Sequence, residues 1–249
     1  PAVADLLATT PGISLTRNGG AGQTTAIGVR GAEDAQTLVL IDGVRVNDPG
    51  APAGAFDFAT LLTANIAQIE ILRGPNSVPW GSQAIGGVVN IVTSAPTDTF
   101  SATLRGEAGS HDRRQLIGRI SGRSGIVSAS FGAGWLRDDG ISAYVDGRER
   151  DGTRQAGGDA RIDVALSDTL ALDLRARYAD SRVDADGYPP PFYSFSDTPD
   201  ISKTREYSGI AGLTASLFEN RLKNRISYSQ SRINRDNFPT SDAEIASFS

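Results

Sequence analysis

The pattern of apolar and polar residues changes near residue 97. Residues 1–96 mix short helical and strand-like segments, and their apolar runs are interrupted by pairs of glycines. From about residue 98 onward, apolar residues alternate with polar or small ones at a period of two, without any helical segment. Successive side chains of a strand point to opposite faces, so this alternation is typical of strands with one apolar and one polar face. The pattern predicts two regions, residues 1–96 and 97–249.

The first region is predicted to be a compact α+β domain. The apolar spacing over residues 3–7 predicts a short helix, and Pro11 and Gly12 end it. An unbroken apolar run before Asp42 and Gly43 predicts a buried strand that enters a tight turn. The predicted strands of this region are residues 13–17, 26–30, 37–41, 68–72 and 88–93.

The second region is predicted to contain about seven antiparallel strands of uniform length, near the ~9 to 11 residues that a tilted strand needs to cross a bilayer. Short turns at 123–125, 167–169 and 219–221 alternate with long polar loops at 138–153 and 184–203. Outer-membrane barrels have this asymmetry of turns and loops. The predicted strands are residues 100–109, 114–122, 126–137, 155–167, 170–182, 205–218 and 222–234.

A soluble antiparallel sandwich is the alternative, and alternation alone would favour it. The predicted polar face, however, carries ions in mid-strand, such as Arg161, Asp163 and Arg175, while the opposite face is almost free of charge. Long strands with such an ionic face favour a barrel in lipid over a soluble sandwich.

Composition excludes several classes. The 249 residues have a net charge of -5, which argues against a nucleic-acid partner. The absence of Cys excludes disulfides and thiolate metal sites. No run of about 18 apolar residues occurs, so no transmembrane helix is predicted.

The sequence offers no catalytic residue. His111 is the only histidine, and its neighbours Ser110 and Asp112 do not form a triad, since successive side chains diverge. The glycine-rich segment 81–86 lacks the lysine of a phosphate loop. We therefore predict neither an enzyme nor a catalytic cofactor.

Five motifs follow one another in the first region. They are PAVADLLATTPGISL at residues 1–15, IGVRG at 27–31, VLIDGVRVND at 39–48, IEILRGP at 69–75 and WGSQAIGGVVNIV at 80–92. In order and spacing they resemble the plug of TonB-dependent outer-membrane receptors, and in wording most closely the cobalamin branch, with siderophore receptors next.

The resemblance implies an α+β plug domain followed by the N-terminal strands of an antiparallel transmembrane β-barrel. It implies a protein of the outer membrane of a Gram-negative bacterium, in contact with outer-membrane lipid. Its function would be energy-coupled uptake of a bulky nutrient, with the inner-membrane TonB complex as partner. The expected ligand is cobalamin, and a ferric siderophore is the alternative.

Three departures from the family pattern stand out. Trp80 occupies a position where the family usually has tyrosine. The coupling segment, or TonB box, that precedes the plug is absent, and the chain opens at Pro1 rather than methionine. About seven strands cannot close a barrel of about 22 strands, so we expect a piece of a longer protein.

Arg30 and Arg73 lie at predicted strand ends within apolar runs, and they need carboxylate partners if they are buried. The resemblance implies that they pair with acidic residues of the barrel wall and hold the plug as latches. A local pairing, for example with Glu70, stays open as the alternative.

The two long loops are rich in carboxylates. Hard oxygen ligands from adjacent loops suit Ca²⁺, and the loops offer Asp146 beside the candidate ligands Asp151, Asp186 and Asp200. The resemblance to cobalamin receptors implies such a calcium site, and solvated loop carboxylates are the alternative. The candidate residues for packing on a bulky ligand are Tyr188, Phe192, Tyr193 and Phe195.

Overall fold

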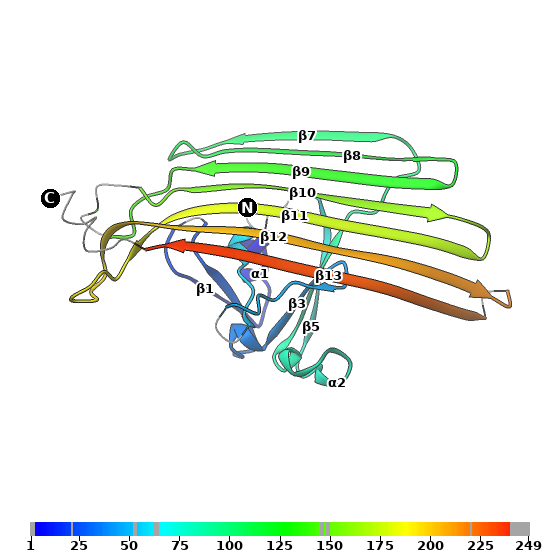
Figure 1. Cartoon of the computed structure of the whole chain (residues 1–249), viewed down its shortest axis with the longest axis horizontal. Coiled ribbons are helices and arrows are strands. Elements are labelled where there is room, and N and C mark those ends of the chain that lie inside the picture. Colours follow the sequence, from blue (N-terminus) through cyan, green and yellow to red (C-terminus); the bar gives the residue numbers. More distant parts are fainter. Residues whose placement is uncertain are drawn as a thin grey trace.

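A computed structural model describes residues 3–20, 22–51, 54–61, 65–144, 147, 150–219 and 221–239. In this part of the chain, a long sheet of seven strands runs beside a smaller N-terminal domain, which packs against one face of the sheet (Figure 1). None of the helices described is long and apolar enough to cross a membrane.

The N-terminal domain contains two small sheets. β1 (Ile13–Arg17) and β2 (Thr25–Val29) form an antiparallel pair beside helix α1 (Val3–Ala8). The second sheet has the order β4-β3-β6-β5, in which β3 and β6 are parallel. Its strands are β3 (Thr37–Ile41), β4 (Val44–Arg45), β5 (Ile66–Arg73) and β6 (Gly87–Thr93), and the short helices are η1 (Asp34–Gln36), η3 (Phe58–Thr60), α2 (Ser77–Trp80) and η4 (Ser82–Ala84).

The predicted elements of this domain are confirmed, and β4 and the short helices η1, η3, α2 and η4 are additions. All five residues of β3 are buried, because Val39 and Ile41 pack into the main core on one face and Leu38 and Leu40 into a second apolar cluster on the other. The predicted turn follows, with Asp42 at φ 53° and Gly43 at φ 81°, as a two-residue hairpin with left-handed backbone requires. The core joins α1 to both sheets through Val3, Leu7, Ile27, Val29, Val39, Ile41, Val89 and Ile91.

The long sheet confirms seven antiparallel strands in sequence order. They are β7 (Ser101–Ala108), β8 (Arg114–Ser124), β9 (Val127–Asp138), β10 (Thr153–Ala165), β11 (Leu170–Gly187), β12 (Ser196–Leu217) and β13 (Leu222–Phe238). The predicted boundary at residues 96 and 97 lies in the connection between β6 and β7, and the division into domains stays a prediction.

Two predictions about this sheet are wrong. Strand length is not uniform, since β7 has 8 residues and β12 has 22. The predicted loop 184–203 is also mostly strand, because β11 continues to Gly187 and β12 begins at Ser196. At this end both faces carry polar residues, so the ladder of backbone hydrogen bonds continues where the apolar alternation has stopped.

The two faces of the sheet differ. The face that points away from the N-terminal domain exposes apolar side chains, among them Leu104, Ile120, Phe131, Trp135, Leu174 and Leu213. The opposite face carries charged residues such as Arg161, Asp163 and Arg177, and it contacts the N-terminal domain through Arg175 and Arg235. We call these the outer and the inner face.

Candidate functional site at the domain interface

Two arginines of the sheet hold two carboxylates of the N-terminal domain. Arg175 Nη1 lies 3.7 Å from Asp42 Oδ1 and donates to the Asp42 carbonyl at 3.3 Å. Arg235 Nη2 lies 3.3 Å from Asp48 Oδ2. Both aspartates are almost buried, so these ion pairs are shielded from solvent and salt.

Asp42 also ties the turn after β3 to the end of β6. Its two carboxylate oxygens accept from the Thr93 backbone N–H at 2.9 Å and the Thr93 hydroxyl at 2.6 Å. The carboxylate therefore connects three elements: β3, β6 and, through Arg175, strand β11 of the wall. This turn therefore fixes the domain to the sheet.

Hydrogen bonds that are not ion pairs continue the contact along the inner face. Asn65 donates to the Asp159 carboxylate from its side-chain amide. Gln155 Nε2 donates to the Ala59 carbonyl at 2.6 Å. Further contacts are Gln23 Nε2 to the Asp184 carbonyl at 2.9 Å and Ser130 Oγ to the Ser94 carbonyl at 3.2 Å.

At Gly22 the backbone of the domain approaches the wall closely. An added Cβ on this residue would lie 2.4 Å from the Cβ of Thr153, and its φ of +88° is left-handed. Only glycine fits this position without a shift of the backbone. The glycine therefore allows the main chain to touch the first residue of β10.

Asp57 is a further buried carboxylate of the domain, and it interacts electrostatically with Arg235 and Glu206 of the wall. Burial raises the pKa of Asp57 above its usual value. The carboxylate accepts hydrogen bonds from the backbone N–H groups of Thr25 and Ala59 at 2.9 and 3.0 Å, and these bonds and the charge of Arg235 act to lower the pKa. The carboxylate of Glu206 acts to raise the pKa. Asp57 thus joins β2 to helix η3 just where the domain meets β12 and β13.

We expect Asp57→Ala to destabilise the N-terminal domain by about 1–3 kcal/mol, because two buried N–H donors lose their acceptor. Asp57→Asn keeps a carbonyl oxygen and should retain most of the stability. Hydrogen exchange of the Thr25 and Ala59 amides in the full-length protein measures the difference. Equal protection of both amides in the wild type and in Asp57→Ala would contradict this role.

Arg30 and Arg73 lie on the side of the domain away from the contacts above. Both side chains are exposed, Arg30 has a left-handed φ of 54°, and its Nη1 lies close to Gly74. Within the described residues neither arginine forms an ion pair, and Glu70 binds Gln68 and Asn90 instead. The local pairing with Glu70 is therefore not formed, and the latch role stays a prediction.

Two of the candidate calcium ligands lie where β10 begins and β11 ends: Asp151 just precedes β10, and Asp186 is near the last residue of β11. Asp151 Oδ2 accepts from the Ala143 N–H at 2.5 Å, and Asp186 Oδ2 accepts from the Tyr144 N–H at 2.7 Å. Burial, and secondarily the nearby Asp186 carboxylate, raises the pKa of Asp151 to about 6. The structure thus brings Asp151 and Asp186 together.

Asp200 is in β12, and its carboxylate lies against Gly187. Among the described residues, no group of three or more His, Cys, Asp or Glu side chains is arranged to hold a metal ion. Asp146 lies outside the described residues. Calcium binding by Asp151, Asp186 and Asp200 stays a prediction.

The four candidate aromatic residues are partly gathered at the same end. Phe195 packs on Tyr188, with ring centroids 5.4 Å apart, and on Tyr144 at 6.1 Å. Phe192 and Tyr193 are 86% and 70% exposed, so they are open to a ligand. Sequence reasoning missed Tyr144, although an aromatic residue in the facing long loop was a signal.

Sequence reasoning also missed the acidic residues of the interface. Asp42 and Asp48 both stand in the motif at residues 39–48, and their partners Arg175 and Arg235 face inward at the period of two. The polarity is the reverse of the predicted latches: here the wall supplies the cations and the domain supplies the carboxylates.

The fold is a small α+β domain held by buried ion pairs against the inner face of a sheet whose outer face is apolar, which is the arrangement of a plug inside a partial β-barrel. Residues 1–88 match the family model described as the TonB-dependent Receptor Plug Domain. This stretch of the chain is therefore a plug domain of the TonB-dependent receptor type.

Solved receptor structures share the fold of nearly the whole chain. The ferric yersiniabactin uptake receptor FyuA from Yersinia pestis is 21% identical, with a TM-score of 0.74 over 95% of this chain and 39% of its own. The alcaligin outer-membrane receptor FauA from Bordetella pertussis is 21% identical, with a TM-score of 0.73 over 96% of this chain and 37% of its own. The siderophore receptor PirA from Acinetobacter baumannii is 18% identical, with a TM-score of 0.72 over 94% and 38%.

The chain spans less than two fifths of the length of these receptors. The antiparallel strands β7 to β13 correspond to strands of a barrel that they do not close by themselves. The expected fold class is confirmed. The cobalamin branch finds no support, since these structures are siderophore receptors.

Proposed function

We propose that the chain is the N-terminal part of an outer-membrane receptor that takes up a ferric siderophore with energy from the inner-membrane TonB complex. The observation that carries the proposal is the plug domain, matched over residues 1–88 and held against the inner face of barrel strands. The solved receptors with this fold bear siderophore names, which favours the siderophore over cobalamin as ligand.

The site supports binding outside and passage through the barrel. Exposed Phe192 and Tyr193, beside the packed group of Tyr144, Tyr188 and Phe195, offer aromatic faces to a bulky chelate. In this proposal the plug blocks the path, and ion pairs and hydrogen bonds attach it to the inner face of the sheet. The partners of a buried ion pair regain their hydration when they separate, which offsets much of the lost attraction, so these contacts suit a plug that must shift and return.

Uptake by the full-length protein tests the proposal. A strain that lacks its own receptors and expresses the full-length gene should accumulate a ferric siderophore from a panel, and uptake should stop when TonB is deleted. Accumulation of cobalamin instead would show that the ligand is cobalamin and not a ferric siderophore. Recovery of the protein in the soluble fraction without detergent would contradict an outer-membrane receptor altogether.

Calcium is a separate part of the proposal, carried by the closeness of Asp151 and Asp186. Binding of the identified ligand should weaken when a chelator removes calcium, and Asp151→Asn should reproduce the loss. Asp168→Asn, in the turn between β10 and β11, is the matched control. Equal binding with calcium and with chelator would leave the carboxylates as loop anchors, through the N–H groups of Ala143 and Tyr144.

A further inference from the structure

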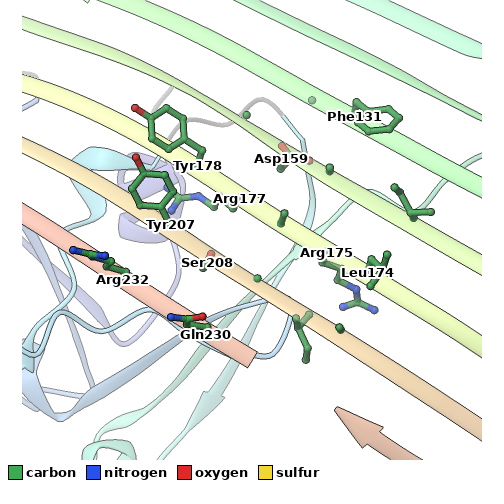
Figure 2. A pocket seen from close by; sticks show the side chains of 18 of the residues that line it. Phe131, Asp159, Leu174, Arg175, Arg177, Tyr178, Tyr207, Ser208, Gln230 and Arg232 are labelled. Carbon is green, nitrogen blue, oxygen red and sulfur yellow. The ribbon is translucent and has the colours of Figure 1, made fainter. Parts of the chain in front are cut away.

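A groove of about 1010 Å³ crosses the outer face of the sheet. Small residues form its floor over three neighbouring strands: Ala160 on β10, Ala176 on β11, and Gly209 and Ala211 on β12. Phe131 on β9 lines one side of the groove (Figure 2), and Tyr228 on β13 also lines it. The groove is therefore an apolar channel on the face that turns away from the plug.

One end of the groove is closed by a row of polar-tipped residues. Tyr178, Tyr207 and Arg232 occupy directly opposed positions on β11, β12 and β13. The two tyrosine rings lie 5.0 Å apart, and Figure 2 shows them side by side with Arg232 on the next strand. Tyrosines on the outer face of a barrel gather where hydrocarbon meets the head-group layer, so this row marks that boundary.

Cations stand in this row and just beyond it. Arg232 Nε donates to the neutral Asn234 side chain at 3.2 Å, and Lys203 Nζ lies 5.0 Å from the ring centre of Phe238. In the part of the chain that the structure describes, neither cation forms an ion pair with a carboxylate. Arg205 forms an ion pair with Asp180, in which Nε lies 3.2 Å from Oδ2, and both side chains are about half exposed.

Two carboxylates lie beside the cations Arg205, Lys203 and Arg232. Asp180 on β11 is opposite Arg205 on β12, and Asp236 on β13 is opposite Lys203 on β12. The three cations outnumber these two carboxylates, and Arg232 is the cation among them that lines the groove. A guanidinium at the edge of hydrocarbon binds phosphate more strongly than one in bulk water, because the local dielectric is lower. The patch thus complements a phosphate attached to an apolar chain.

We propose that the groove binds an acyl chain of a phosphorylated lipid of the outer leaflet, with the lipid phosphate on Arg232 and Arg205. The proposal rests on the proposed function, since it requires the outer face to stand in the outer membrane. It goes further in assigning a site outside the barrel, away from the plug and the nutrient path. The occupant is one lipid held in place rather than the general contact of a barrel with its bilayer.

Native mass spectrometry of the full-length protein in detergent tests the site. The probes are bis-phosphorylated lipid A, the same lipid with its phosphates removed, and inorganic phosphate alone. We expect retention of the phosphorylated lipid, at least about tenfold weaker retention after dephosphorylation, and no retention of free phosphate. Arg232→Gln should weaken the phosphorylated lipid by about tenfold and leave the dephosphorylated lipid unchanged.

A second variant addresses the acyl chain, and both have matched controls. Ala211→Leu fills the groove floor and should weaken both lipids. Ala215→Leu lies on the same face of β12 but outside the groove, and Arg114→Gln removes an exposed outer-face arginine on β8. Equal retention of the two lipids by the wild type, or equal losses in variants and controls, would overturn the site.

The outcome is separable from the proposed function. Ferric siderophore uptake by Arg232→Gln should match the wild type, because the groove lies outside the barrel. Loss of selective lipid retention with normal uptake would remove the lipid site alone. Retention of lipid with no TonB-dependent uptake would remove the transport proposal and keep the site.

Discussion

Replacing Arg177 with methionine is expected to destabilise the folded protein by about 3–5 kcal/mol, because it removes one partner of a buried ion pair. Arg177 Nη1 lies 2.7 Å from Glu206 Oε2, and the two side chains are only 12% and 9% exposed. Methionine keeps the apolar stem but leaves the Glu206 carboxylate without this cation. The nearby Asp57 carboxylate adds repulsion. The guanidinium unfolding midpoint of the full-length protein in detergent measures the loss.

Two comparisons make this expectation specific. Arg105 pairs with Glu107 on the same face, but its side chain is 69% exposed, so Arg105→Met should change stability by no more than about 1 kcal/mol. Arg177→Met combined with Glu206→Leu removes both charges and should recover most of the stability. If Arg177→Met and Arg105→Met shift the midpoint equally, burial does not set the strength of these pairs.

The strands were predictable because their signal is local. Alternation such as that of Val127, Ala129 and Phe131 needs only the period of the pleat, and the Asp42 and Gly43 turn needs only a left-handed hairpin. The last residues of β11 and the first residues of β12 could not be predicted in the same way. Arg182 and Lys203 point outward there and Ser181 and Thr204 inward, so no apolar face remained to count.

The interface was not predictable for a different reason. The ion pair of Asp42 and Arg175 joins residues 133 positions apart, and the sequence does not state which turn meets which strand. The motif at residues 39–48 showed that the aspartates matter without showing what they bind. Periodicity showed that Arg175 faces inward, and only the packing of the plug turned two separate signals into one contact.

The proposed function requires a plug that is firm and still movable, and the interface is compatible with both. Its ties to the wall are ion pairs and side-chain hydrogen bonds at Asp42, Asp48, Asn65 and Ala59, while its apolar core joins α1 to the plug's own sheets. The plug can therefore leave the wall without opening its core. We expect the plug to move as a unit, because exposing its apolar core to water would cost far more than separating polar groups that regain their hydration.

Fixing the plug to the wall is expected to reduce ligand uptake at least about tenfold, because lid-type motion must precede passage. Asn65 and Asp159 contact each other through their side chains, from the plug and from β10. Asn65→Cys with Asp159→Cys, joined by a short thiol-reactive cross-linker that a reductant cleaves, would hold the plug in place. The 249 residues contain no cysteine, so the introduced pair is unambiguous within them. Reductant should restore uptake of the ferric siderophore.

A second pair separates blocked motion from damage by the reagent. Thr97 Oγ1 and Ser121 Oγ lie 2.7 Å apart, and Thr97 belongs to the connection between β6 and β7. A cross-link between Thr97→Cys and Ser121→Cys therefore restrains only the connection and leaves the plug core free to move. Uptake should persist in this pair under the conditions that abolish it in the first. Full uptake with Asn65→Cys and Asp159→Cys completely joined would mean that the ligand passes without movement of this part of the plug.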